Sequence, residues 1–125
     1  MAEPENGLTE ALGDEVGADL RTIGRFTPEE YDIVYQRDDV AARYTAEEID
    51  EIHREQVFEW LNRPYIEELF DSVGELDCTT RWFDDIVVFL VLPDGDERAL
   101  FVSVDRTDGL DADAVVACCL DAVAA

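Results

Sequence analysis

The sequence predicts a single α+β domain in which a five-stranded antiparallel sheet carries helices on both faces, in the order α-ββ-α-βββ-α. Its 125 residues suit one hydrophobic core. Stretches in which apolar residues alternate with polar ones are separated by stretches with the apolar spacing of helices. Residues 86–92 are apolar throughout, which is typical of a central strand buried on both faces. Such a strand needs helices on each side of the sheet.

The chain begins with a predicted tail, residues 1–7, followed by one domain over residues 8–125. Within that domain, Leu8, Leu12 and Val16 are spaced as on one side of a short amphipathic helix, which Gly13 interrupts.

A hairpin follows, with strands at residues 20–26 and 31–36. The residues between them, 27–30, form a turn in which Pro28 takes the position that suits its fixed φ. The same four residues also fit a helix start at Thr27. The turn is preferred because β-branched and aromatic residues follow at once.

The longest predicted helix begins at Thr45, whose side chain and Glu48 form a capping box. Its apolar side carries Ile49, Ile52, Val57 and Trp60. Pro64 breaks the helix near Asn62, and a second segment continues to a stop at Gly74.

Three strands and a helix complete the chain. The strands are predicted at residues 76–82, 86–92 and 98–104, with tight turns at Asp84-Asp85 and at residues 93–96. Asp111 then caps a last helix. Its apolar stripe contains Ala112, Val115, Val116, Cys119, Leu120 and Val123.

Charge is the strongest compositional signal. The chain carries 32 acidic and 9 basic residues, for a net charge of −23, and every basic residue is Arg. Such self-repulsion weakens a compact state unless molar salt shortens the Debye length to roughly 3 Å. We therefore expect a protein of a halophile's cytoplasm. The alternative is a mimic of DNA or a binder of basic partners, which is disfavoured because the acidity is spread along the whole chain.

Several classes of partner and location are disfavoured. The acidic composition argues against nucleic acid and anionic membranes as partners. No apolar run has the length of a membrane span, and the N-terminus lacks the features of a secretory signal. The three cysteines form no C-x-x-C pair and leave an odd count, so we expect reduced thiols.

The order of elements resembles that of the roadblock and longin group of the profilin-like architecture. It is less similar to the PAS and GAF sensor domains, whose helices are placed differently. Three segments, residues 19–25, 31–39 and 83–89, are also similar to a family of small acidic haloarchaeal proteins of unknown function. This second resemblance implies source and fold, and it carries no functional residues.

No group of residues indicates catalysis, a cofactor or a metal ion. Cys118 and Cys119 are adjacent on a helix, so they point about 100° apart and are poorly placed to share one metal. Cys78 is expected to be a sheet residue facing helices. His53 is the only histidine, and spacing suggests no partner for it. Paired carboxylates such as Asp84-Asp85 carry no signal in so acidic a chain.

Large aromatic side chains outnumber what so small a core needs. Excess apolar surface on an acidic protein marks an interface. The candidate interface residues are Phe58, Trp60, Tyr65, Trp82 and Phe83.

Two functions are favoured, and neither is an enzyme. An enzyme is the third and least favoured alternative, which a buried acidic residue beside His53 would support. The first is a protein-interaction module, homodimeric through the long helix or an edge strand, with a further protein partner in a regulatory or scaffold complex. The second is a small-molecule sensor with a pocket between sheet and long helix, lined by Tyr35, Trp60 and Trp82. A cavity with converging polar groups favours this second reading.

Overall fold

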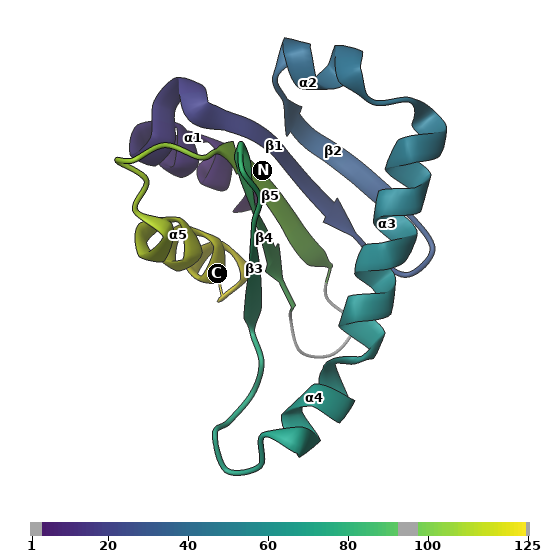
Figure 1. Ribbon diagram of the computed structural model, residues 1–125. Coiled ribbons are helices and arrows are strands. Elements are labelled where there is room, and N and C mark those ends of the chain that lie inside the picture. The colour runs from purple at the N-terminus through teal and green to yellow at the C-terminus, as the bar shows by residue number, and fades with distance from the viewer. Residues whose placement is uncertain (1–3, 93–97, 125) are drawn as a thin grey trace.

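The computed structural model describes residues 4–92 and 98–124 (Figure 1). Its helices are α1 (Pro4–Val16), α2 (Asp38–Arg43), α3 (Ala46–Leu61), α4 (Arg63–Leu69) and α5 (Ala112–Ala124), with a 3-10 turn η1 (Gly17–Asp19) after α1. Its strands are β1 (Leu20–Phe26), β2 (Tyr31–Gln36), β3 (Cys78–Trp82), β4 (Ile86–Val91) and β5 (Ala99–Asp105).

The five strands form one antiparallel sheet in the order β2-β1-β5-β4-β3. The fold class predicted from the sequence is therefore confirmed. The position of residues 86–92 needs one refinement. The strand β4 is internal, between β5 and β3, but the middle strand of the sheet is β5.

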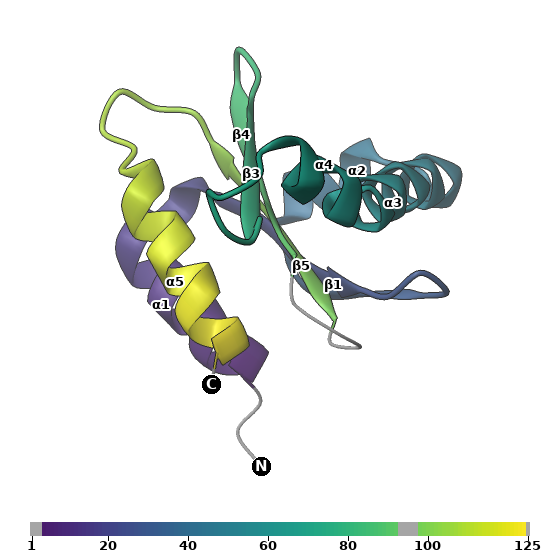
Figure 2. The ribbon, with the colours of Figure 1, turned by 90° about the horizontal axis from the view of Figure 1, so that it is seen from below.

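Helices cover the sheet on two sides. Figure 2 shows α1 and α5 side by side on one face, with α2, α3 and α4 on the other. We call these the α1/α5 face and the α3 face. The strands β2 and β3 form the two edges.

The ends of α3 and α5 coincide with capping and breaking signals in the sequence. The Thr45 side chain accepts a hydrogen bond from the Glu48 backbone N–H, and the Glu48 carboxylate accepts one from the Thr45 N–H, so the predicted capping box is present. The predicted break falls at Asn62, between α3 and α4. Asp111 caps α5 by accepting a hydrogen bond from the Ala114 N–H.

Some boundaries differ from the prediction. The helix α1 starts at Pro4, so residues 4–7 are helical rather than part of a tail, and it runs through Gly13 without a break. A proline suits a first helical turn because the missing N–H has no partner there anyway. The edge strand β3 starts at Cys78 rather than at residue 76. The predicted turn at 93–96 lies outside the described residues.

The short helix α2 was missed. Asp38 and Asp39 stand in its first turn and Arg43 in its last, which is the arrangement that the helix dipole favours. Its six residues are too few to show helical periodicity in the sequence. Val40 is the one residue of α2 that is buried.

The two faces are packed differently. The larger core lies on the α1/α5 face, where fully covered side chains from both helices meet the sheet: Leu8, Leu12, Leu20, Ile23, Val87, Phe89, Val91, Leu100, Val102, Val104, Val115 and Cys119. The α3 face holds a smaller cluster of Phe26, Leu90, Leu92 and Ala99, with Trp60 and Val57 packed against it.

Candidate functional site

Four of the five candidate interface residues are exposed. These are Phe58, Tyr65, Trp82 and Phe83, and Phe58 exposes 74% of its surface. Trp60 is placed differently. It is half-buried, and its ring meets Phe26 edge-on at 5.7 Å between centroids. Trp60 therefore anchors α3 to the sheet, because its position on the helix faces inward.

Phe58 belongs to a longer row of exposed apolar side chains on α3, α4 and the turn after α4. We define the α3–α4 ridge as Phe58, Leu61, Tyr65, Leu69, Phe70 and Val73. The spacing 58, 61, 65, 69 follows one side of a helix. Sequence analysis identified two of these residues and missed the other four, because isolated leucines and valines are usually assigned to a core.

Polar contacts connect α3 to the edge strand β3. Arg81 donates to both oxygens of Glu55, at 2.7 and 2.8 Å, and also to the Glu59 carboxylate. The Thr79 hydroxyl donates to Glu59 at 2.6 Å. The residues on either side of Phe58 in α3 are thus attached to the free edge of the sheet.

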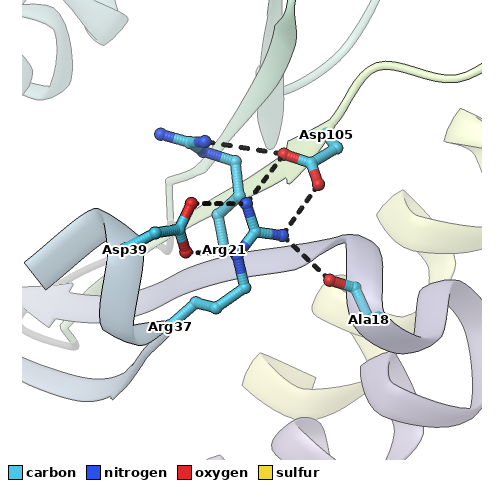
Figure 3. A network of polar contacts seen from close by, with 5 residues as sticks. All are labelled: Ala18, Arg21, Arg37, Asp39 and Asp105. Carbon is cyan, nitrogen blue, oxygen red and sulfur yellow. Dashed lines mark hydrogen bonds and ion pairs between the residues drawn. The ribbon is translucent and has the colours of Figure 1, made fainter.

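At the other end of the α3 face, the Arg37 side chain joins three elements (Figure 3). Its guanidinium donates to both oxygens of Asp105 at the end of β5 and to both oxygens of Asp39 in α2. It also donates to the carbonyl oxygen of Ala18 in η1. Arg21 adds a longer ion pair to Asp105, at 3.5 Å.

This network shifts the pKa values of Arg37, Asp39 and Asp105. Hydrogen bonds to Asp39 and Asp105 raise the pKa of Arg37 above its usual value. Hydrogen bonding from Arg37 is the largest cause that lowers the pKa of Asp105, and the same holds for Asp39. Ion pairs of Arg37 and Arg21 with Asp105, and of Arg37 with Asp39, thus hold α2 and the end of β5 together.

His53 is engaged in a structural contact. Its Nε2 lies 2.8 Å from the carbonyl oxygen of Thr27, so that nitrogen carries the proton and donates it. Its ring packs edge-on against Phe26 and tilted against Tyr31, at 5.7 and 5.2 Å between centroids. This placement fastens α3 to the hairpin turn.

The cysteines are free thiols. Burial raises the pKa of Cys78 to about 11 and that of Cys119 to about 12. Burial also raises the pKa of Cys118. A thiol nucleophile or metal ligand reacts as the thiolate, so these shifts disfavour both roles. Among the residues that the structure describes, no three His, Cys, Asp or Glu side chains gather as metal ligands would.

A cavity of about 90 Å³, partly open to solvent, lies on the α3 face. Its walls come from β1, β2, β4 and β5, from α2 and from one side of α3. The apolar part of the lining includes Phe26, Ile33, Val40, Ile49, Ile52, Ile86 and Phe101. Three almost fully covered polar side chains also line it: Thr22, Gln56 and Ser103.

The pocket predicted between sheet and long helix therefore exists, but its predicted lining is wrong. Tyr35 pairs with Ile23, and Trp82 pairs with Val87, so both rings point to the α1/α5 face. Trp60 lies one turn beyond the cavity, against Phe26. The signal that was missed is Gln56, a polar residue on the sheet-facing side of α3.

In the described ranges, no helix is both long enough and apolar enough to cross a membrane. No curated protein matches the chain. A solved structure described as "MglB with tetrameric arrangement" is similar in fold, with a TM-score of 0.62 and 13% sequence identity. The match covers 98% of this chain and 86% of the other. This likeness agrees with the roadblock-like, profilin-like fold class. A family model spans residues 6–124, and the chain thus belongs to the family described as "Domain of unknown function (DUF7522)".

Proposed function

We propose that this chain is a non-catalytic protein-interaction module of a regulatory or scaffold complex, and that it acts as a homodimer in the cytoplasm of a halophile. The observation that carries the proposal is the α3–α4 ridge on a chain of net charge −23. A surface so rich in carboxylates has no reason to expose six large apolar side chains on neighbouring elements unless another molecule covers them.

The size of the ridge supports a dimer. At about 150–250 Å² per aromatic side chain, the ridge as a whole exposes on the order of 600 Å². A standard interface covers about 800 Å² on each partner. The neighbouring free edge of β3 supplies unpaired backbone groups, which suit the addition of a strand from a second copy. The contacts of Arg81 with α3 place ridge and edge next to each other.

Salt makes such a dimer possible. Two copies of a chain with charge −23 repel strongly when the Debye length is about 30 Å, as at 0.01 M salt, and weakly when it is about 3 Å, as at 1 M. The proposal therefore includes a salt requirement: the dimer forms in molar KCl and dissociates as salt is removed.

The histidine and the cysteines are the side chains best suited to catalysis, and their surroundings do not favour it. This supports a module without catalysis. His53 holds the Thr27 carbonyl, and the thiol pKa values of Cys78 and Cys119 are raised far above neutral pH. The fold likeness to MglB concerns the fold alone. The proposal also includes assembly of the homodimer with a further protein partner.

Light scattering coupled to size-exclusion chromatography in molar KCl tests the dimer. The expected mass is twice that of the chain. The double variant Phe58→Glu with Tyr65→Glu should give a monomer, whereas Thr107→Glu, which adds charge at an exposed site away from the ridge, should stay dimeric. A wild-type monomer at high protein concentration and high salt would refute the homodimer.

A further inference from the structure

We propose that the cavity on the α3 face binds a small uncharged ring compound that carries an amide group. This site goes beyond the interaction role proposed above and does not depend on it. The argument rests on three buried polar side chains, on the pairing of the charges around them, and on the size of the cavity.

Three polar side chains from three elements meet at the cavity: Thr22 of β1, Gln56 of α3 and Ser103 of β5. They expose 5%, 6% and 4% of their surface. Thr22 and Ser103 are register partners, so both side chains point from the sheet toward α3. Within residues 4–92 and 98–124, none of these three side chains has a hydrogen-bond partner in the protein. The polar groups of these three side chains are therefore available to a molecule that enters the cavity, either water or a ligand.

The charged side chains in the wall each have an ionic or hydrogen-bonding partner, although the buried Nε of Arg21 itself has none within the described residues. Arg21 forms its ion pair with Asp105, and Asp32 accepts from Arg98 at 2.8 Å. His53 uses its Nε2 on the Thr27 carbonyl. An ionic ligand would therefore lose its hydration without gaining a free counter-charge. The groups that remain for a ligand are two hydroxyls and one amide, each able to donate and to accept, together with the Nε–H of Arg21, which can only donate.

The Gln56 amide indicates what the ligand carries. A carboxamide presents a donor and an acceptor side by side, so it pairs through two parallel hydrogen bonds with a group that offers the complementary pair. Glutamine reads the edge of adenine in this way. A primary or cyclic amide offers the same pair, and the two hydroxyls can complete its remaining hydrogen bonds.

The dimensions and the walls limit the rest of the ligand. A volume of about 90 Å³ is well below the ~300–1,000 Å³ of drug-sized sites, which excludes nucleotides and large cofactors. It suits about three waters at ~30 Å³ each, or one six-membered ring. Phe26, Phe101 and Ile52 supply apolar surface for the ring. Gly24 lies in the cavity wall, and a Cβ there would stand 3.5 Å from the Asp32 carbonyl oxygen, an ordinary contact, so an alanine fits at this position without strain.

Benzamide is the probe, titrated into the full chain in molar KCl and followed by NMR shifts of the Gln56 side-chain amide. Benzoate and toluene serve as comparisons of similar shape, the first charged and the second without polar groups. We expect saturable binding of benzamide that is at least tenfold tighter than that of the other two. Equal affinity for toluene would overturn the proposal in favour of an unselective apolar cavity. No saturable shift at millimolar benzamide would overturn it in favour of a cavity filled by water only.

Variants test the role of the three side chains. Gln56→Leu and Thr22→Val should each weaken benzamide binding at least tenfold, with a melting temperature equal to or above that of the wild type, because each removes a polar group without a partner. The same Thr→Val change at exposed Thr107 should leave binding unchanged. Gly24→Ala, which adds a methyl group to the cavity wall, should weaken binding while the polar groups stay intact. Unchanged binding in folded Gln56→Leu would contradict the assignment. The mass in solution is measured on the same samples, so a monomer that binds benzamide or a dimer that does not separates this site from the interaction role.

Discussion

The two faces of the sheet are held by different kinds of contact. On the α1/α5 face, Leu12 of α1 and Val115 and Cys119 of α5 are fully covered. On the α3 face, the one buried residue of α3, a helix that the structure describes in full, is Gln56. The comparison indicates that the α1/α5 face provides most of the stability, whereas the α3 face carries the cavity and the exposed α3–α4 ridge.

The sequences of the helices explain the difference. The described part of α5 carries two charged residues, Asp113 and Asp121, and places an apolar stripe on the sheet. The helix α3 is rich in glutamate. Val57 and Trp60 pack on the smaller apolar cluster, and the other attachments are polar: Arg81 with Glu55, Tyr31 with Asp50, and His53 with Thr27. Exposed ion pairs contribute only about 0–1 kcal/mol each, so they position α3 more than they stabilise it.

The largest expected difference comes from removing one aliphatic side chain on each face. Leu12→Ala in α1 should lower the free energy of unfolding by about 2–5 kcal/mol, because it leaves a cavity in a closed core. Ile49→Ala in α3 should lower it by about 1 kcal/mol, because Ile49 is half-buried beside an existing cavity. Chemical denaturation in molar KCl measures both. Equal losses would mean that the two faces are equally packed.

The Arg37 network offers a smaller effect with a site-specific measurement. Arg37→Gln should lower the free energy of unfolding by about 1 kcal/mol, since it removes charged hydrogen bonds from the partly buried Asp105 that solvent screens only in part. The lowered pKa of Asp105 means that its ionised form favours the folded state. That contribution is complete above the unfolded value of about 3.9 and is lost as pH falls through the folded pKa.

In Arg37→Gln the pKa of Asp105 should therefore rise, as followed by NMR titration of its carboxyl carbon. The matched control is Arg43→Gln, which removes an exposed arginine of α2 and should leave Asp105 unchanged. An Asp105 pKa that stays the same in Arg37→Gln would show that Arg37 is not its main partner.

The smallest expected effect is a difference in thiol reactivity. Cys119 is fully buried on the α1/α5 face and its thiol pKa is raised to about 12, so a maleimide should modify it only after unfolding. Cys118 is partly exposed on the same helix and should react first. Mass spectrometry of peptides over time gives the order. Rapid native labelling of Cys119 would show that the α1/α5 face opens readily.

Much of the fold follows from signals that are local in sequence. The Thr45–Glu48 capping box, the break before Pro64 and the apolar run from Ile86 each depend on neighbours within a few residues. The order of elements then restricts the sheet to few topologies. The helix α2 escaped prediction because its six residues are stabilised by Arg37 contacts with β5 and η1, which are distant in sequence.

The candidate site was less predictable, because it depends on which face each residue takes. The bulge between Ile23 and Gly24 shifts the register of β1 against β2, and such shifts cannot be read from alternation alone. Tyr35 was consequently assigned to the wrong side. Trp82 lies on β3, whose register with β4 is regular, and its side was misassigned because no local pattern tells which face of the sheet α3 covers. The convergence of Thr22, Gln56 and Ser103 requires the packing of α3 on the sheet, which no local pattern specifies.

Native-state hydrogen exchange in molar KCl tests the contrast between the faces most directly. If α3 is held mainly by polar contacts, its backbone amides should exchange through local opening, at a free energy clearly below that of global unfolding. The amides of α5 and β5 should exchange only with global unfolding. Protection of α3 equal to that of α5 in the monomeric Phe58→Glu, Tyr65→Glu variant would contradict the division of the molecule into a stabilising face and a binding face.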